Sequence, residues 1–254
     1  MAYRRQIQDW CRRLGLDVRR FRPLAGDAFA AQMFLLRNTS CQLIFDVGGY
    51  RGEVANRYAQ LFPQAEIWTF EPFPASYNLL HQRFLGNARI HPVNSAVSSE
   101  TGQVPLYANR LAATNSLLPR PASGRRYYAK DGVTVEQVTV STVSLDDFRT
   151  ERQLAAPDIL KMDIQGKELD ALRGAESTLR SGETKLIYTE VMFVPHYEGS
   201  ALFYELAAFL ATFGYTLFGL YDLKWARIGQ IRAGDAIFVS DALRTDVINQ
   251  LPDE

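Results

Sequence analysis

The feature that most constrains the fold is a regular alternation of short apolar runs and helical stretches, which begins at residue 42 and continues through roughly 150 residues. The runs, such as Leu43–Phe45, are continuously apolar, as expected for parallel strands that helices cover on both faces. The pattern therefore predicts a doubly wound α/β sheet. The expected strands occupy residues 42–47, 66–70, 89–93, 158–162, 185–189 and 236–240, and the expected helices 52–62, 75–86, 167–180 and 200–213.

Two regions depart from this alternation. Gln103–Ala108 and Val133–Val143 alternate apolar with polar residues, which predicts an inserted antiparallel β-hairpin. The residues between them, Asn109–Asp131, are rich in Ala, Asn, Ser, Pro, Gly and Arg, and we expect a loop over the sheet edge. Near the end, strands at about 215–220, 225–231 and 235–239 follow one another without a helix, which indicates an antiparallel meander.

The composition fits a folded chain. The 47% hydrophobic share among 254 residues excludes a disordered protein, and the length admits one large domain or two small ones. We expect a single main domain over residues 41–254. Residues 1–40 are expected to form an N-terminal helical extension, because residues 4–20 carry apolar positions at helical spacing.

Charge and cysteine usage narrow the functional classes. The 28 basic residues balance 28 acidic ones, so no overall field favours nucleic acid as a partner. Cys11 and Cys41 are not clustered with each other or with histidine, which argues against a disulfide framework or a zinc site. No signal-peptide core and no run of about 18 apolar residues is present, so we predict a cytoplasmic protein without a membrane span or a metal site.

The strongest local motif is IFDVGGYRGE at residues 44–53, where the first clear strand ends. Asp46, Gly48 and Gly52 form a D-x-G-x-x-x-G turn that leads into a helix. Glycine there allows a sharp turn and close approach of a ligand, and the N–H groups of the following helix attract a carboxylate. An NAD(P) fingerprint would need glycine at the positions held by Tyr50 and Glu53. An ordinary strand-to-helix turn is the alternative.

Two further strand ends add ligand-binding candidates. Glu71 follows the next strand, 23 positions after Gly48, where doubly wound folds place a carboxylate against ribose hydroxyls. Pro72 then fixes the chain direction. A solvent-exposed loop glutamate is the alternative interpretation. Ser95 and Ala96, at the end of the third strand, are small enough to approach a flat adenine ring.

Asp163 ends a later strand in the segment DILKMDIQGKEL at 158–169. Ligands bind beyond the carboxyl ends of strands in open α/β sheets, so Asp163 should face the same site as Asp46 and Glu71. Gln165 could hydrogen-bond a polar substrate. Lys161, two residues earlier, lies on the same side of the strand as Asp163, and either a structural ion pair or a catalytic role would explain it.

Glu190 should be the acid at the tip of the neighbouring strand, with His196 in the loop above it. The chain has three histidines, and one near a reaction centre can act as a base because its pKa lies close to neutral pH. The alternative is an incidental loop histidine.

Together these motifs resemble the FkbM family of S-adenosylmethionine-dependent methyltransferases, over about residues 40–240. The segments that carry the resemblance are IFDVGGYRGE at 44–53, FEPFP at 70–74, NSAVS at 94–98, TNSLL at 114–118 and LKMDIQGKELDALRGAE at 160–176. The resemblance implies a Rossmann-like sheet of about seven strands in the order 3-2-1-4-5-7-6, mostly parallel with an antiparallel last strand. It departs at Gln165, where the family usually has an acid.

The resemblance also implies methyl transfer to a hydroxyl of a sugar, glycolipid or other small natural product. The methionine part of S-adenosylmethionine would lie at the Asp46–Gly52 turn, the ribose at Glu71, and the methyl group near Asp163. The implied cofactor-binding residues are Asp46, Gly48, Gly49, Gly52, Glu71, Pro72, Ser95, Ala96 and Asp163, and the candidate catalytic residues are Asp163, Glu190 and His196.

Three alternatives stay open from the sequence: an NAD(P)-dependent oxidoreductase, a non-catalytic cofactor-binding module, and a nucleic-acid methyltransferase. The last is disfavoured by the balanced charge and by the lack of an Asp/Asn-Pro-Pro-Tyr segment. We expect a small-molecule or glycan acceptor, bound by the segments 109–131 and 192–199. An oligomer is compatible with the sequence.

Overall fold

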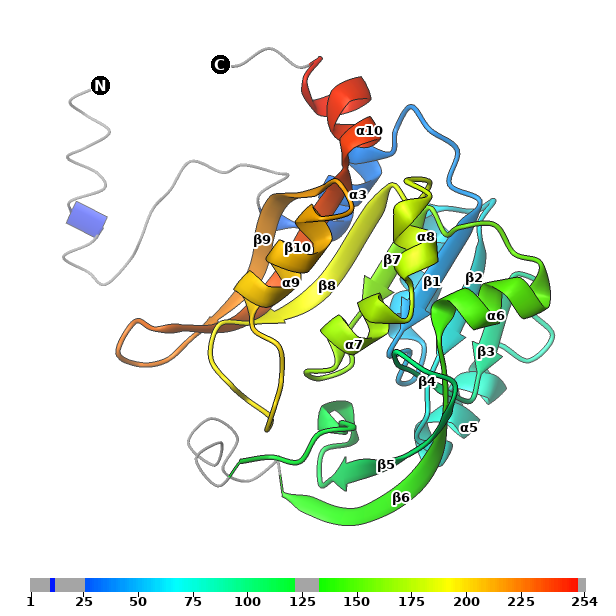
Figure 1. Ribbon diagram of the computed structural model, residues 1–254, viewed down its shortest axis with the longest axis vertical. Coiled ribbons are helices and arrows are strands. Elements are labelled where there is room, and N and C mark those ends of the chain that lie inside the picture. Colours follow the sequence, from blue (N-terminus) through cyan, green and yellow to red (C-terminus); the bar gives the residue numbers. More distant parts are fainter. Residues whose placement is uncertain (1–9, 12–25, 122–132, 251–254) are drawn as a thin grey trace.

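A seven-stranded sheet forms the centre of the computed structural model, which describes residues 10–11, 26–121 and 133–250 (Figure 1). Its order is β3-β2-β1-β7-β8-β10-β9, and β10 runs in the opposite direction to the other six strands. The predicted Rossmann-like class and strand order are thereby confirmed. The strands are β1 (Leu43–Val47), β2 (Glu66–Phe70), β3 (Ile90–Val93), β7 (Ile159–Met162), β8 (Leu186–Met192), β9 (Tyr215–Trp225) and β10 (Ile231–Ser240).

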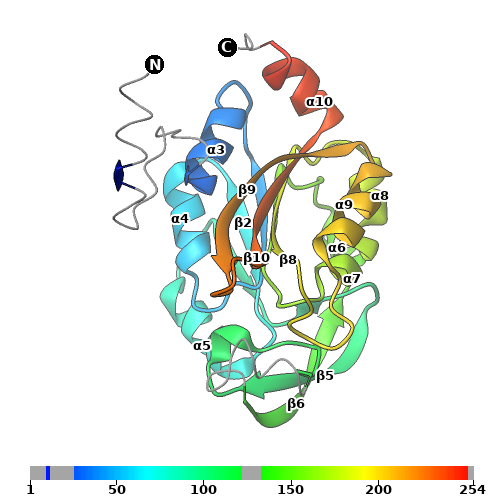
Figure 2. The ribbon, with the colours of Figure 1, turned by 90° about the vertical axis from the view of Figure 1, so that its left-hand side faces the viewer.

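Helices cover both faces of this sheet, as Figure 2 shows edge-on. Side chains alternate along each strand, so that Ile44 packs with the helices of one face and Phe45 with those of the other. One layer holds α3 (Ala28–Leu35), α4 (Glu53–Leu61) and α5 (Pro74–Arg83); the other holds α6 (Leu145–Arg152), α7 (Glu168–Arg173), α8 (Glu176–Arg180) and α9 (Phe203–Ala211). The short α10 (Asp241–Leu243) and the turn η3 (Arg244–Ile248) follow β10.

The predicted hairpin is present as β5 (Gly102–Asn109) paired antiparallel with β6 (Thr134–Val143). It belongs to a separate sheet of order β4-β6-β5, in which β4 is Ala96–Val97. The turn η1 (Ala112–Thr114) follows β5. In Figure 1 this small sheet lies beyond the carboxyl ends of β1 and β2, the edge of the main sheet at which the sequence predicts a binding site.

Two element boundaries differ from the prediction. Residues 225–231 form no strand of their own, because β9 continues to Trp225 and a turn closed by Ala226 N–H donating to the Gln230 carbonyl (2.8 Å) leads into β10. The helix expected over 167–180 is split into α7 and α8 at Gly174. A Cβ on Gly174 would lie 2.1 Å from the Ser98 carbonyl oxygen, so the chain passes too close to that backbone for a side chain.

The predicted N-terminal helix over residues 4–20 lies outside the described residues except for Trp10 and Cys11. The division at residue 40 stays a prediction, although α3, on its N-terminal side, packs Phe29 against Tyr58 and Tyr188 of the main core. None of the helices in the described part of the chain is long and apolar enough to cross a membrane.

Candidate active site

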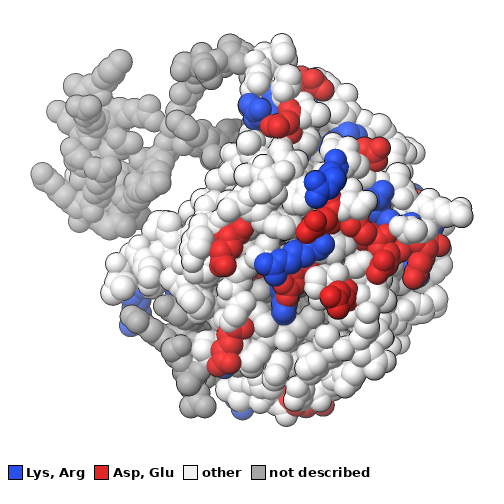
Figure 3. All heavy atoms as spheres, viewed as in Figure 1, with Lys and Arg blue, Asp and Glu red and all other residues white. Residues whose placement is uncertain are grey.

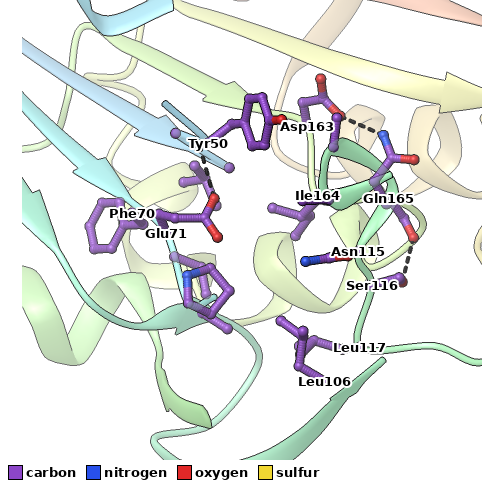
Figure 4. Close-up of a pocket in the computed structure, with 18 of the residues that line it drawn as sticks. Tyr50, Phe70, Glu71, Leu106, Asn115, Ser116, Leu117, Asp163, Ile164 and Gln165 are labelled. Atoms are coloured by element: carbon purple, nitrogen blue, oxygen red, sulfur yellow. Dashed lines mark hydrogen bonds between the residues drawn. The ribbon is translucent and has the colours of Figure 1, made fainter. Parts of the chain in front are cut away.

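A pocket opens where β1, β2 and β7 end, and the segment after β5 forms its opposite wall (Figure 4). The structure brings most of the predicted site residues together there: Gly48, Gly49, Glu71, Pro72, Ser95, Ala96 and Asp163 line it. Four predicted residues lie outside the lining: Asp46, Gly52, Glu190 and His196. The carboxyl edge of the sheet is therefore hollowed at the expected point.

The glycine turn after β1 is folded tightly against two neighbouring strands. The N–H groups of Gly48 and Gly49 both donate to the Phe70 carbonyl, at 3.0 and 2.8 Å. Gly48 has φ +84°, and a Cβ on it would lie 1.9 Å from the Asp163 carbonyl oxygen. Glycine is thus required for close approach of backbone to backbone, and the first two amides of the turn are used within the protein rather than for a ligand.

The N-terminus of α4 faces the pocket, because Glu53 and Val54 line it. Gly52 is the N-cap, has φ +83°, and provides no side-chain cap. A helix start without a side-chain cap leaves N–H groups that can receive a carboxylate. Gly52 itself packs away from the pocket, since a Cβ there would lie 2.4 Å from the Phe84 ring.

Asp46 lies beneath the turn in a buried ion pair. Its Oδ1 is 2.9 Å from Lys161 Nζ, and its Oδ2 accepts from the Thr69 hydroxyl at 3.0 Å. Burial by itself would lower the pKa of Lys161, but the charges of Asp46 and Asp163 raise that pKa above its ordinary value. Lys161 thus forms an ion pair and also borders the pocket, whereas Asp46 has no exposed surface toward a ligand.

Glu71 is fixed at the pocket wall by backbone donors. Its Oε2 accepts from the Tyr50 N–H and its Oε1 from the Phe73 N–H, each at 2.9 Å. Burial raises the pKa of Glu71 to about 7, although both backbone hydrogen bonds and the nearby Lys161 oppose that rise. Each carboxylate oxygen keeps a second lone pair for a ligand hydroxyl. The group can accept from both hydroxyls of a cis-diol.

Asp163, Gln165 and Glu190 form one hydrogen-bonded group. The Gln165 amide nitrogen donates to Asp163 Oδ1 at 2.8 Å and to Glu190 Oε2 at 2.9 Å, while its oxygen accepts from the Tyr197 hydroxyl at 2.7 Å. Gln165 therefore has no amide hydrogen left for the substrate contact that the sequence suggested. Burial and the charge of Asp163 raise the pKa of Glu190 well above its usual range.

His196 is buried, with 2% of its surface exposed, and does not line the pocket. Burial lowers its pKa to about 4, and the positive charges of Arg232 and Arg120 act in the same direction. An imidazole with this pKa is neutral but a weak proton acceptor at neutral pH. Of the three candidate bases, Asp163 alone borders the pocket.

Three residues that shape the pocket were not singled out from the sequence. The Glu168 carboxylate accepts from the N–H groups of Ile164 and Gly166, each at 3.0 Å, and so fixes the turn after Asp163. Tyr50 adopts φ +47° and supplies one of the two donors to Glu71. Glu168 could have been found from its position in the K-x-D-x-x-G-x-E spacing, whereas nothing in the sequence marks the backbone of Tyr50.

Asn115, in the TNSLL segment, is the third residue of the site that was not singled out from the sequence. Its Oδ1 accepts from the Asn109 N–H at 2.7 Å, which fixes the orientation of the amide. Nδ2 is buried without a hydrogen-bond partner and points toward the pocket (Figure 4). Within residues 10–11, 26–121 and 133–250, no group of three or more His, Cys, Asp and Glu side chains is arranged to hold a metal ion.

Comparison with known proteins identifies the family. The model of the methyltransferase FkbM domain matches residues 46–217, which include the glycine turn, Glu71 and Asp163. The chain belongs to the FkbM methyltransferase domain family.

Two curated relatives share this family's region. A 2-O-methyltransferase, NoeI, from Sinorhizobium fredii is 29% identical over 164 residues, which are 62% of this chain and 66% of the relative. A hexuronic acid methyltransferase, AglP, from Haloferax volcanii is 23% identical over 166 residues, 65% of this chain and 63% of the relative. The matched part thus spans slightly less than two thirds of each relative's length.

Solved structures with a similar fold include other methyltransferases. Precorrin-6y C5,15-methyltransferase from Geobacter metallireducens GS-15 has 13% identity and a TM-score of 0.46, covering 84% of this chain and 87% of its own. Magnesium protoporphyrin IX methyltransferase from Synechocystis PCC 6803, with bound SAM, has 10% identity and a TM-score of 0.47, covering 84% and 75%.

Proposed function

We propose that this protein is an S-adenosylmethionine-dependent O-methyltransferase whose acceptor is a hydroxyl of a sugar, glycan or related small molecule. Family membership supports methyl transfer, and two relatives are named a 2-O-methyltransferase and a hexuronic acid methyltransferase. The observation that carries the proposal is the Glu71 carboxylate, held by two backbone N–H groups at the wall of a pocket that also contains the glycine turn and Asp163.

The residues of the pocket fit the proposed cofactor. Glu71 can accept from both ribose hydroxyls, and the uncapped start of α4 can receive the amino-acid carboxylate. Pro72, Ala96 and Val97 offer small apolar contacts for the adenine ring. The unpartnered Nδ2 of Asn115 supports the same fit, because a buried donor without a partner is costly unless a ligand satisfies it.

S-adenosylmethionine bound here would supply an electrophilic methyl group on a positively charged sulfur, and the sulfur would keep the electron pair of the bond that breaks as the acceptor oxygen takes the methyl group. Asp163 borders the pocket and would take the proton that the acceptor hydroxyl loses. A positioned base contributes on the order of 10²–10⁴-fold, whereas alignment of the reacting atoms can contribute about 7–11 kcal/mol. The rigid pocket walls therefore matter more than the base.

The acceptor class has one further support. Basic and acidic side chains are interspersed on the face shown in Figure 3, without a broad area of one sign. This face therefore offers no broad basic area for a polyanion such as a nucleic acid.

The decisive test is titration calorimetry with S-adenosylhomocysteine, with NADH as the competing ligand. Saturable binding of the first and none of the second is the expected result. The protein is then incubated with S-adenosylmethionine and a panel of methyl glycosides of hexoses and hexuronic acids. Mass spectrometry follows the two products, S-adenosylhomocysteine and the methylated glycoside. Binding without methyl transfer to any glycoside would favour a non-catalytic module, and NADH binding would favour an oxidoreductase.

A further inference from the structure

Gln165 occupies an unusual backbone position at the end of β7. Its φ of +60° lies in the left-handed region, which a side chain other than glycine rarely adopts without local support. That support is visible: the Ser116 hydroxyl donates to the Gln165 carbonyl at 2.7 Å, and the adjoining Gly166 N–H donates to Glu168. The conformation directs the amide between two carboxylates, Asp163 and Glu190.

The orientation of this amide is fixed by its partners. The amide nitrogen donates to Asp163 Oδ1 and Glu190 Oε2, and the amide oxygen accepts from the Tyr197 hydroxyl. Tyr197 in turn accepts from the Arg120 guanidinium at 2.8 Å. The single hydrogen of the Tyr197 hydroxyl has two acceptors within reach, the Gln165 amide oxygen at 2.7 Å and the Thr114 carbonyl at 3.1 Å, and the contact with Gln165 is the shorter.

We propose that Gln165 is a positioning residue that orients Asp163 for acceptance of the acceptor proton. This inference rests on the proposed methyltransferase function. The amide engages Oδ1 of Asp163 and leaves Oδ2 for the acceptor hydroxyl, and in the described part of the chain no other side chain donates to Asp163. Asp163 is largely exposed to the pocket, so without this bond its carboxylate would be free to rotate.

A neutral amide suits this position better than an acid. Glutamate at residue 165 would bring a third carboxylate to Asp163 and Glu190 and would remove both donated hydrogen bonds. The introduced carboxylate would repel Asp163 instead of donating a hydrogen bond to it, so Asp163 would lose its fixed orientation. The family's usual acid at this position is therefore predicted to be a poor substitute in this chain, because the surroundings of Gln165 are arranged for a donor.

The proposal is tested with Gln165→Met, which keeps the length of the side chain without its hydrogen-bonding groups. Gln165→Glu supplies the acid, and Gln137→Met, at an exposed site on β6, is the matched control. We expect kcat for the best methyl glycoside to fall about 10- to 100-fold in both Gln165 variants, since loss of orientation removes part of the contribution of a base. The affinity for S-adenosylhomocysteine should fall less than kcat, because both amide hydrogens of Gln165 are donated to Asp163 and Glu190 rather than to the cofactor.

Coupling to Asp163 separates positioning from general support of the fold. The double variant Asp163→Asn with Gln165→Met should be no slower than Asp163→Asn alone, because both changes remove the same action. The proposal would be overturned if the fold-losses in kcat of the two single variants multiplied in the double variant. It would also be overturned if the affinity of Gln165→Met for S-adenosylhomocysteine fell in parallel with its kcat. If wild-type protein fails to bind S-adenosylhomocysteine, the proposed function fails instead.

A second measurement requires no acceptor. In protein labelled with ¹⁵N in the glutamine side chains, the Gln165 amide signal is identified by its absence in Gln165→Met. Asp163→Asn and Tyr197→Phe should each displace that signal, while Glu66→Gln, on the exposed start of β2, should leave it unchanged. A Gln165 signal unaffected by Asp163→Asn would show that the amide does not hold Asp163, and would overturn the proposal even if no glycoside is methylated.

Discussion

Lys161 Nζ lies 2.9 Å from Asp46 Oδ1 directly beneath the candidate active site, with 5% and 0% of the two side chains exposed. The same ammonium donates to the carbonyls of Val47 and Gly48, at 3.3 and 2.9 Å. One buried cation therefore ties the last residues of β1 to β7. The glycine turn is therefore held by this ion pair and its backbone hydrogen bonds as well as by its glycines.

Replacement of Lys161 by Met should strongly destabilise the fold. Removal of one partner leaves the Asp46 carboxylate buried without its countercharge, a loss of about 3–5 kcal/mol. Urea unfolding monitored by circular dichroism measures the change. The double variant Lys161→Met with Asp46→Asn should recover a large part of it, because no net charge then remains buried. A single variant as stable as wild type would contradict the role assigned to the pair.

The close approach at Gly48 predicts a second effect on stability. Gly48→Ala places a Cβ 1.9 Å from the Asp163 carbonyl oxygen, so the strands must move apart. Gly86→Ala is the matched control, because Gly86 has a similar φ of +79° but open space around it. We expect Gly86→Ala to cost about 1 kcal/mol and Gly48→Ala about 2 kcal/mol more. If urea unfolding gave the same loss of unfolding free energy for both variants, the added Cβ at residue 48 would be accommodated without destabilising the fold.

Most of the fold could be predicted because the buried strands are short, continuous and separated by helices. β1 and β2 were predicted nearly to the residue, since Leu43–Phe45 and Ile67–Phe70 have no alternative to burial on both faces. The close approach of Gly174 to the Ser98 carbonyl could not be predicted, because Ser98 is far away in sequence. The end of β9 was misjudged because its long course crosses several register shifts.

The site was predictable where a residue's position along a strand decides its place. Glu71 and Asp163 end parallel strands, and that alone brings them to one edge. The direction of a side chain was not predictable in the same way: Asp46 faces its register neighbours Thr69 and Lys161 within the sheet rather than the pocket. Gln165 likewise depends on Tyr197, which belongs to a distant loop.

Glu71→Gln should weaken cofactor binding without loss of the fold. The amide keeps the shape but provides a single acceptor oxygen, and its NH₂ group would oppose one of the two backbone donors, Tyr50 or Phe73. Hydrogen bonds to a charged group are worth about 1.5–3 kcal/mol, so the affinity for S-adenosylhomocysteine should fall roughly 10- to 100-fold. Calorimetry measures the change, with Glu66→Gln as the control, and an unchanged affinity would remove Glu71 from ribose recognition.

Cofactor affinity should also depend on pH through Glu71. Its pKa is raised to about 7, and hydroxyl donors favour the ionised form. Below this value the carboxyl group is increasingly protonated, so the affinity for S-adenosylhomocysteine should fall as the pH decreases from about 8 to about 6, by at most about tenfold per pH unit. In Glu71→Gln the affinity for S-adenosylhomocysteine should not change with pH over this range. A pH dependence that persists in the variant would assign it to another group.

The stability of the unliganded protein should respond to the same group in the opposite direction. The folded-state pKa of about 7 lies above the ordinary glutamate pKa of 4.5, so Glu71 binds its proton more tightly in the folded state. Its contribution to stability is fully present below pH 4.5 and is lost as the pH rises through 7. As the pH rises between these two values, the unfolding free energy of the wild type should therefore decrease relative to that of Glu71→Gln.

Asp163 and His196 make separable predictions for the base. Asp163→Asn removes a carboxylate that borders the pocket and should lower kcat by about 10²–10⁴-fold, while binding of S-adenosylhomocysteine is retained. His196→Asn should lower kcat less than about tenfold, because an imidazole with a pKa of about 4 is a weak base and lies outside the pocket lining. The pH–rate profile decides between them, since loss of the base removes the acidic limb of kcat. A profile that keeps this limb in Asp163→Asn and loses it in His196→Asn would transfer the role to the histidine.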